Sequence, residues 1–96
     1  MPKGYWVLTY HSVEYPEKLE AYRKLAPGAM ERAGGRFLAR NDPSVVHEAG
    51  KMERVVLVEF DSLDAAIAAH EAPDYGEALK VFGDAAVRDF RIVEGV

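Results

Sequence analysis

The stretch Val55-Val56-Leu57-Val58-Glu59-Phe60 is the clearest β-strand in this sequence and decides the fold that we expect. β-Branched and aromatic residues favour strands, and successive side chains along a strand point to opposite faces of its sheet. Both sets of alternate residues in this stretch are mostly apolar. A sheet covered by helices on one face should instead alternate apolar and polar residues. We therefore expect both faces of this strand to be covered.

The segments around this strand alternate between strand and helix patterns. Strand patterns cover residues 5–13, 36–40, 55–60 and 87–93, helical patterns cover 16–33, 63–72 and more briefly 74–83, and residues 44–48 can also be extended. The order β-α-β-β-α-β, with an extra short helix before the last strand, predicts a ferredoxin-like α+β fold. In that fold an antiparallel four-stranded sheet carries its helices on one face.

The helical patterns also predict which side chains face the sheet. Pro27 lies inside the first helix and should kink it or divide it near residues 25–26. The residues expected to face the core are Leu19, Tyr22, Ala26, Ala29, Met30 and Ala33 in the first helix, Leu63, Ala66, Ile67 and His70 in the second, and Tyr75, Ala78, Leu79 and Phe82 in the third.

Length and composition indicate one globular domain spanning residues 1–96. The net charge of −4 argues against a nucleic-acid backbone as partner. No segment has the run of apolar residues that a membrane span needs. The start of the chain has no apolar export signal, and cysteine is absent, so we expect a cytoplasmic protein.

A homodimer is the expected way of covering the second face of the sheet. The first strand is also apolar on both faces, with Trp6 and Leu8 on one side and Tyr5 and Val7 on the other. Large exposed apolar patches are rare on monomers, and a second copy could cover this one by two-fold symmetry. The alternative is a monomer whose loops fold over the sheet.

Five segments in order resemble the domain-of-unknown-function family 1330. They are Gly4-Tyr5-Trp6-Val7, residues 34–40, residues 56–62 followed by Ala65-Ala66, Pro73-Asp74-Tyr75, and residues 92–96. The resemblance implies a ferredoxin-like fold of the dimeric α+β barrel superfamily, and it implies no known activity.

Several positions depart from the pattern of that family. Tyr15 replaces an aspartate that would cap the first helix, Ala69 and His70 replace an aromatic pair, Ala72 replaces a serine, and Phe82 replaces an arginine. If that arginine binds an anionic ligand in the relatives, it is missing here.

Candidate site residues come from aromatic and polar side chains on the predicted strands and helices. A ligand pocket is expected from Trp6, Tyr10, Tyr75 and Phe82, with His11 or Arg40 as its polar group and with Glu59 and His70 as further candidates. Arg40 and Glu59 could pair across the sheet or face a cleft. The three histidines lack metal-ligand spacing, and the sequence contains no nucleotide or flavin motif, so we expect neither a metal nor a cofactor.

Three kinds of function remain open at this point. The first is a dimer that binds a small hydrophobic or aromatic metabolite, or a cofactor-independent monooxygenase or isomerase that acts on one. The second is a non-catalytic structural or sensor dimer. The third, heme-linked chemistry, would need His70 to be exposed beside a wide apolar cavity.

Overall fold

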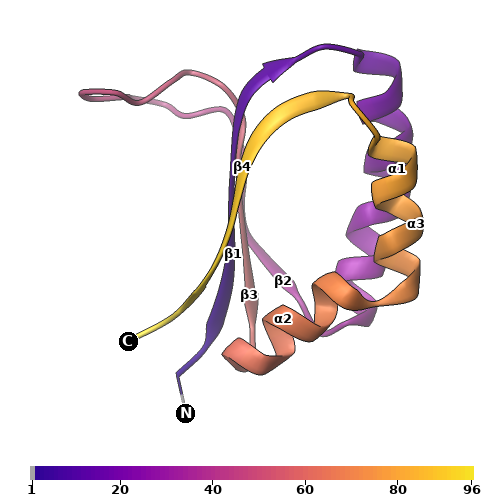
Figure 1. The fold of residues 1–96 in the computed structure, drawn as a ribbon. Helices are drawn as coiled ribbons and strands as arrows, with labels where there is room; N and C mark the ends of the chain where they lie inside the picture. The colour runs from indigo at the N-terminus through magenta and orange to yellow at the C-terminus, as the bar shows by residue number, and fades with distance from the viewer. Residues whose placement is uncertain (1) are drawn as a thin grey trace.

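The computed structural model describes residues 2–96 as one antiparallel sheet with three helices on one of its faces (Figure 1). The elements are β1 (Gly4–Val13), α1 (Pro16–Arg32), β2 (Arg36–Asn41), β3 (Val55–Phe60), α2 (Leu63–Glu71), α3 (Pro73–Phe82) and β4 (Ala86–Glu94). The strand order is β2-β3-β1-β4, and all three neighbouring pairs are antiparallel. This arrangement confirms the predicted ferredoxin-like fold.

The core lies between the sheet and the helices. The sheet contributes Trp6 and Leu8 from β1 with Val58 and Phe60 from β3, and each of them is almost completely buried. The indole N–H of Trp6 donates a hydrogen bond of 2.8 Å to the carbonyl oxygen of Ala66 in α2. This bond holds α2 against the sheet and satisfies the one polar atom of the largest core side chain.

Three expectations about local structure are wrong. The helix α1 is not divided near residues 25–26: it runs from Pro16 to Arg32 as one element with Pro27 inside it, and Ala26, Ala29 and Met30 are buried on both sides of the proline. In α2 the buried residues are Ala66 and Ala69. The contact between α2 and Trp6 turns Ile67 outward, so Ile67 is 45% exposed. Residues 44–48 do not form a strand.

Residues 42–54 form a loop that projects away from the sheet on the side opposite to the helices (Figure 1). The loop cannot pair with β3, because β1 and β2 already pair with β3 along the length of that strand. Val45 and Met52 in this loop are 71% and 57% exposed. The loop therefore presents apolar side chains in front of the uncovered face of the sheet.

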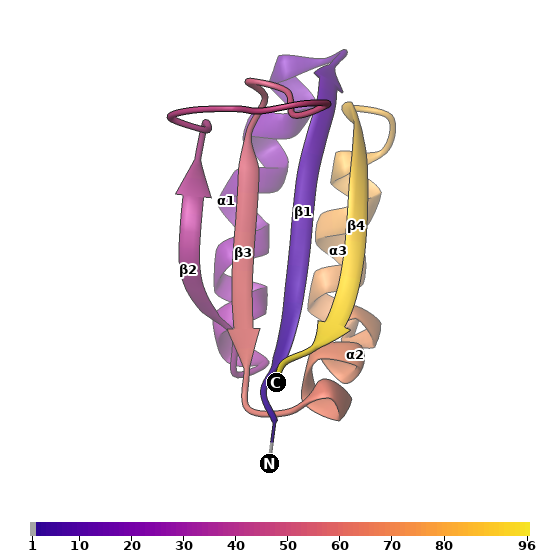
Figure 2. The ribbon, with the colours of Figure 1, turned by 90° about the vertical axis from the view of Figure 1, so that its left-hand side faces the viewer.

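Figure 2 views the sheet from the face that the helices leave uncovered. By alternation along the strands, this face carries the second apolar set of β1 and β3. Tyr5, Val7 and Leu57 lie there half-buried, and Val93 on β4 is 49% exposed.

Throughout residues 2–96, no helix has the length and hydropathy needed to cross a membrane.

Gly4 lies where β1 passes the start of α2. A Cβ atom at this position would collide with the backbone carbonyl oxygen of Ser62. We expect Gly4→Ala to lower the free energy of unfolding by about 1–3 kcal/mol, because the backbone must shift to relieve the collision. Urea unfolding followed by circular dichroism measures the change.

Gly76→Ala is the matched control, because a Cβ atom at this position in α3 would contact nothing within 4 Å. Alanine costs less backbone entropy in a helix, so this variant should gain about 0.5–1 kcal/mol. Equal stabilities for the two variants would contradict the close approach at Gly4.

Candidate functional site

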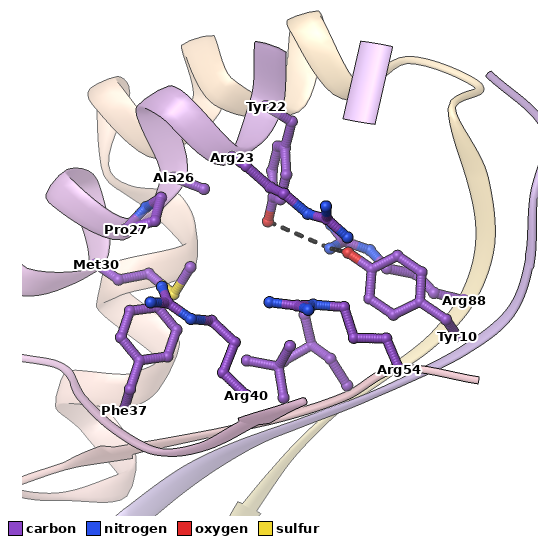
Figure 3. Close-up of a pocket in the computed structure, with 12 residues that line it drawn as sticks. Tyr10, Tyr22, Arg23, Ala26, Pro27, Met30, Phe37, Arg40, Arg54 and Arg88 are labelled. Carbon is purple, nitrogen blue, oxygen red and sulfur yellow. Dashed lines mark hydrogen bonds between the residues drawn. The ribbon is translucent and has the colours of Figure 1, made fainter. Parts of the chain in front are cut away.

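A cavity of about 350 Å³ lies between α1 and the helix-facing side of the sheet (Figure 3). We call it the cleft. It is lined by Leu8, Tyr10, Tyr22, Arg23, Ala26, Pro27, Met30, Phe37, Arg40, Arg54, Val56 and Arg88. Its inner surface is mainly apolar, and its polar atoms come from arginine and tyrosine side chains.

A β-bulge in β2 turns Arg40 into the cleft. The pairing of β2 with β3 shifts between Phe37 and Ala39, so that Phe37 lies opposite Val58 and Arg40 lies opposite Val56. Both partners belong to the helix-facing side of β3. A regular strand would have placed Phe37 and Arg40 on opposite faces. The guanidinium of Arg40 instead lies 4.3 Å from the centroid of the Phe37 ring.

Arg54 lies at the mouth of the cleft, just before β3, and shares the helix-facing side with Val56. Figure 3 shows the side chains of Arg23, Arg40 and Arg54 extending into the space between helix and sheet. The pKa of Arg54 is lowered, first by burial and then by the positive charge of Arg23. The positive charge of Arg40 lowers the pKa of Arg54 further. The negative charge of Asp42 raises this pKa, but by less than Arg23 lowers it. The mouth of the cleft is therefore a region of concentrated positive charge.

The inner end of the cleft is a hydrogen-bonded group of tyrosines around Arg88. One guanidinium nitrogen of Arg88 donates to the hydroxyl oxygens of Tyr10 and Tyr22, each at 3.2 Å. The hydroxyl of Tyr22 lies 2.7 Å from that of Tyr75, and this pair is buried. Burial raises the pKa of the Tyr75 hydroxyl far above its ordinary value. These contacts can orient a polar atom of a molecule bound in the cleft.

Two of the candidate residues predicted from sequence line the cleft, namely Tyr10 and Arg40. Trp6 and Tyr75 lie fully buried in the core, with Tyr75 reaching the cleft only through Tyr22. Phe82 lies beneath Arg88, whose guanidinium is 4.1 Å from the centroid of its ring. A positive charge therefore lies beside the position where the family pattern has an arginine.

The other three candidates lie away from the cleft. His70 is half-buried, packs edge-on against Trp6 and Phe90, and borders a separate hollow beside β4. His11 is exposed and lies near the projecting loop. Glu59 belongs to the uncovered face of the sheet.

The predicted pairing of Arg40 with Glu59 is wrong. Glu59 accepts hydrogen bonds from Arg36, at 3.1 and 3.2 Å, and from the hydroxyl of Tyr5 at 3.2 Å. Arg36 lies directly opposite Glu59 in the sheet, whereas the bulge places Arg40 on the other face. The two residues are separated by the sheet.

Sequence reasoning missed Arg23, Arg54 and Arg88 as lining residues. Two of them carry a signal that could have been used, because Arg54 and Arg88 lie two residues before the helix-facing Val56 and Phe90. Arg23 is exposed next to the buried Tyr22 in α1, and only the arrangement of α1 over the sheet brings it to the cleft.

The part of the chain that the structure describes holds no group of three or more histidine, aspartate or glutamate side chains placed to ligate a metal. The cleft contains arginine and tyrosine in place of metal ligands. Its geometry favours recognition of an organic molecule through hydrogen bonds, charge and apolar contact.

These features define a small ferredoxin-like α+β domain with a cationic cleft between helix and sheet. Residues 3–96 match the model of a family described as a domain of unknown function, DUF1330, and the chain belongs to that family. No curated protein matches the sequence.

Solved structures of the same fold share little sequence with this chain. A protein of unknown function from Rhodopseudomonas palustris is similar with a TM-score of 0.72 and 19% identity, over 99% of this chain and 83% of that one. A cofactor-independent oxygenase from Streptomyces nogalater is similar with a TM-score of 0.66 and 14% identity, over 97% and 92%. A dimeric protein of unknown function from Bacteroides fragilis is similar with a TM-score of 0.62 and 14% identity, over 96% of this chain and 95% of that one. At these identities the likeness establishes the fold alone.

The buried hydroxyl pair of Tyr22 and Tyr75 should contribute to stability. Tyr22→Phe leaves the Tyr75 hydroxyl without its partner and removes one acceptor of Arg88, so we expect a loss of about 1–3 kcal/mol in the free energy of unfolding. The double variant Tyr22→Phe/Tyr75→Phe should lose less than the sum of the single losses.

Tyr15→Phe is the control, because Tyr15 is 43% exposed and its change should stay within about 0.5 kcal/mol. Strictly additive losses from Tyr22→Phe and Tyr75→Phe, measured by urea unfolding, would show that the two hydroxyls do not interact.

Proposed function

We propose that this protein binds a small hydrophobic or aromatic metabolite in the cleft between α1 and the sheet. The observation that carries the proposal is the cleft itself, with a volume of about 350 Å³, an apolar floor and a few polar groups at its ends. Sites for small molecules typically combine these three properties. Leu8, Met30 and Val56 supply the floor, and the ring of Phe37 supplies a flat wall.

A cofactor-independent monooxygenase or isomerase is the second candidate. The tyrosine hydroxyls around Arg88 favour it, because a guanidinium beside a phenolic oxygen can stabilise negative charge that develops on a substrate. The structurally similar oxygenase from Streptomyces nogalater shows that this fold can carry such a reaction. Release of a chemically altered ligand in air would distinguish an enzyme from a binding protein or a structural dimer. Liquid chromatography with mass spectrometry detects an oxygenated product by its added mass and an isomer by its changed retention time.

We further propose that two copies pair through their uncovered sheet faces. The apolar side chains Val7 and Leu57 on this face support the pairing, and so does the loop of residues 42–54, which projects past the sheet on the same side (Figure 1). The charged pair Arg36 and Glu59 at the edge of the face would help to set the orientation of the two copies.

Binding in the cleft can be tested with two planar aromatic probes, 2-naphthoate and the neutral 2-naphthamide. Titration of the ¹⁵N-labelled protein with each probe should give saturable shifts of the backbone amide signals of Tyr10, Ala26 and Val56. Signals from the uncovered face, such as that of Val7, should stay in place. If neither probe moves the cleft signals, the proposed function fails.

The adjacent residues Phe37 and Leu38 offer a matched pair of variants. Phe37→Ala removes one wall of the cleft and should weaken the tighter probe roughly tenfold, as expected for the loss of a partly buried aromatic contact. Leu38 is 55% exposed and does not line the cleft, so Leu38→Ala should bind as the unchanged protein does. Equal weakening by both variants would place the site elsewhere.

The pairing of sheets predicts the mass of the particle in solution. Sedimentation velocity should give the mass of two chains for the unchanged protein and the mass of one chain for Leu57→Asp. The new carboxylate would lose its hydration in the apolar interface and find no charged partner there, so it should prevent the pairing. Ile67→Asp is the control, since Ile67 is 45% exposed on α2 and away from the proposed interface. A one-chain particle for the unchanged protein would overturn the proposed dimer.

A further inference from the structure

We infer that the molecule bound in the cleft is an organic anion whose carboxylate group is held at the mouth by Arg40 and Arg54. The inference rests on the proposed binding function and adds the chemical class of the ligand. The apolar part of that ligand would lie inward, over Leu8, Met30 and Val56.

The distribution of charge in the molecule carries this inference. The chain has a net charge of −4 and only 12 lysine and arginine residues. Four of those basic residues, all of them arginines, line the cleft, and no aspartate or glutamate does. An acidic protein thus has a locally cationic cavity, and a low-dielectric cavity of one sign attracts the opposite charge.

The arginines outside the cleft are paired with carboxylates, which makes those inside it exceptional. Arg32 bonds to Asp74 at 2.8 Å, Arg36 to Glu59 at 3.1 Å, and Arg91 to Asp89 at 2.9 Å.

Within residues 2–96, in contrast, no carboxylate oxygen lies within 4.0 Å of the guanidinium groups of Arg40, Arg54 and Arg88. Arg23 has only a long contact of 3.8 Å with the exposed Glu20. The cleft therefore offers guanidinium groups that no carboxylate of the described residues pairs with.

The unpaired arginines also repel one another. Arg23 and Arg40 both lower the pKa of Arg54, which is the effect of like charges placed close together. A bound carboxylate would remove part of this repulsion and accept paired N–H donors in the forked geometry that guanidinium groups favour. Arg88 is less available, because it already donates to Tyr10 and Tyr22. The carboxylate position thus falls at the mouth, between β2 and the start of β3.

The two naphthalene probes test this inference because they have the same shape and differ in charge. 2-Naphthoate should bind in the cleft about tenfold or more tightly than 2-naphthamide, which is the difference expected for hydrogen bonds to a charged group. The affinity of 2-naphthoate should fall as salt is raised, while that of 2-naphthamide should change little.

Variants then locate the carboxylate. Arg40→Gln and Arg54→Gln should each bring the ratio of the two affinities closer to one, with the affinity for 2-naphthamide preserved. Lys24→Gln is the control for net charge, because Lys24 is exposed on α1 and does not line the cleft. This control should leave the ratio unchanged. The dispersion of the amide spectrum reports that each variant is folded.

The outcomes separate the inference from the function on which it rests. Equal affinities for the two probes in the cleft would overturn the anionic ligand. A ratio that survives both arginine variants would overturn the assignment of its carboxylate to Arg40 and Arg54. Either result leaves the binding function standing. If neither probe binds in the cleft, both proposals fail. A ratio that drops equally in Lys24→Gln would show a general charge effect and would also overturn the inference.

Discussion

The anchor of Trp6 between the sheet and α2 is the contact on which the rest of the structure depends. Its indole is fully buried, bonds to the carbonyl of Ala66 at 2.8 Å, and lies 5.0 Å from the ring centroids of Phe60, Tyr75 and Phe90. Aromatic contacts of this kind add to the free energy of burial. They fill the layer between sheet and helices at the α2 end, so the remaining space lies beneath α1, where the cleft is found.

The two faces of the sheet have different surroundings because successive side chains of β1 and β3 alternate between them. Trp6, Leu8 and Tyr10 face the helices, whereas Tyr5 and Val7 face away from them. The first set builds the core and one wall of the cleft. The second set leaves an apolar surface that helices do not cover. The cleft and the uncovered apolar surface therefore lie on opposite sides of the same strands in a chain of 96 residues.

The position of Arg40 in the cleft depends on a small irregularity of the sheet. The bulge in β2 turns Arg40 towards the helices and separates it from Glu59, which Arg36 then pairs with. Tyr10 lies opposite Arg88 in the regular part of the β1–β4 pairing, before that pairing shifts between Tyr10 and Ser12. Bulges commonly redirect a side chain next to a functional site. Here the bulge in β2 adds Arg40 to the face on which Arg54 and Arg88 already lie by regular alternation.

The sequence by itself determined the order of the elements, the bounds of β3 and the ferredoxin-like fold, because periodicity and turn residues are local properties. It also indicated Tyr10 and Arg40 as lining residues. Only the tertiary structure decided that Arg23 joins them, that α1 continues through Pro27, and that Glu59 pairs with Arg36. Each of these depends on strand register or on packing between distant segments, and a linear pattern carries no record of either.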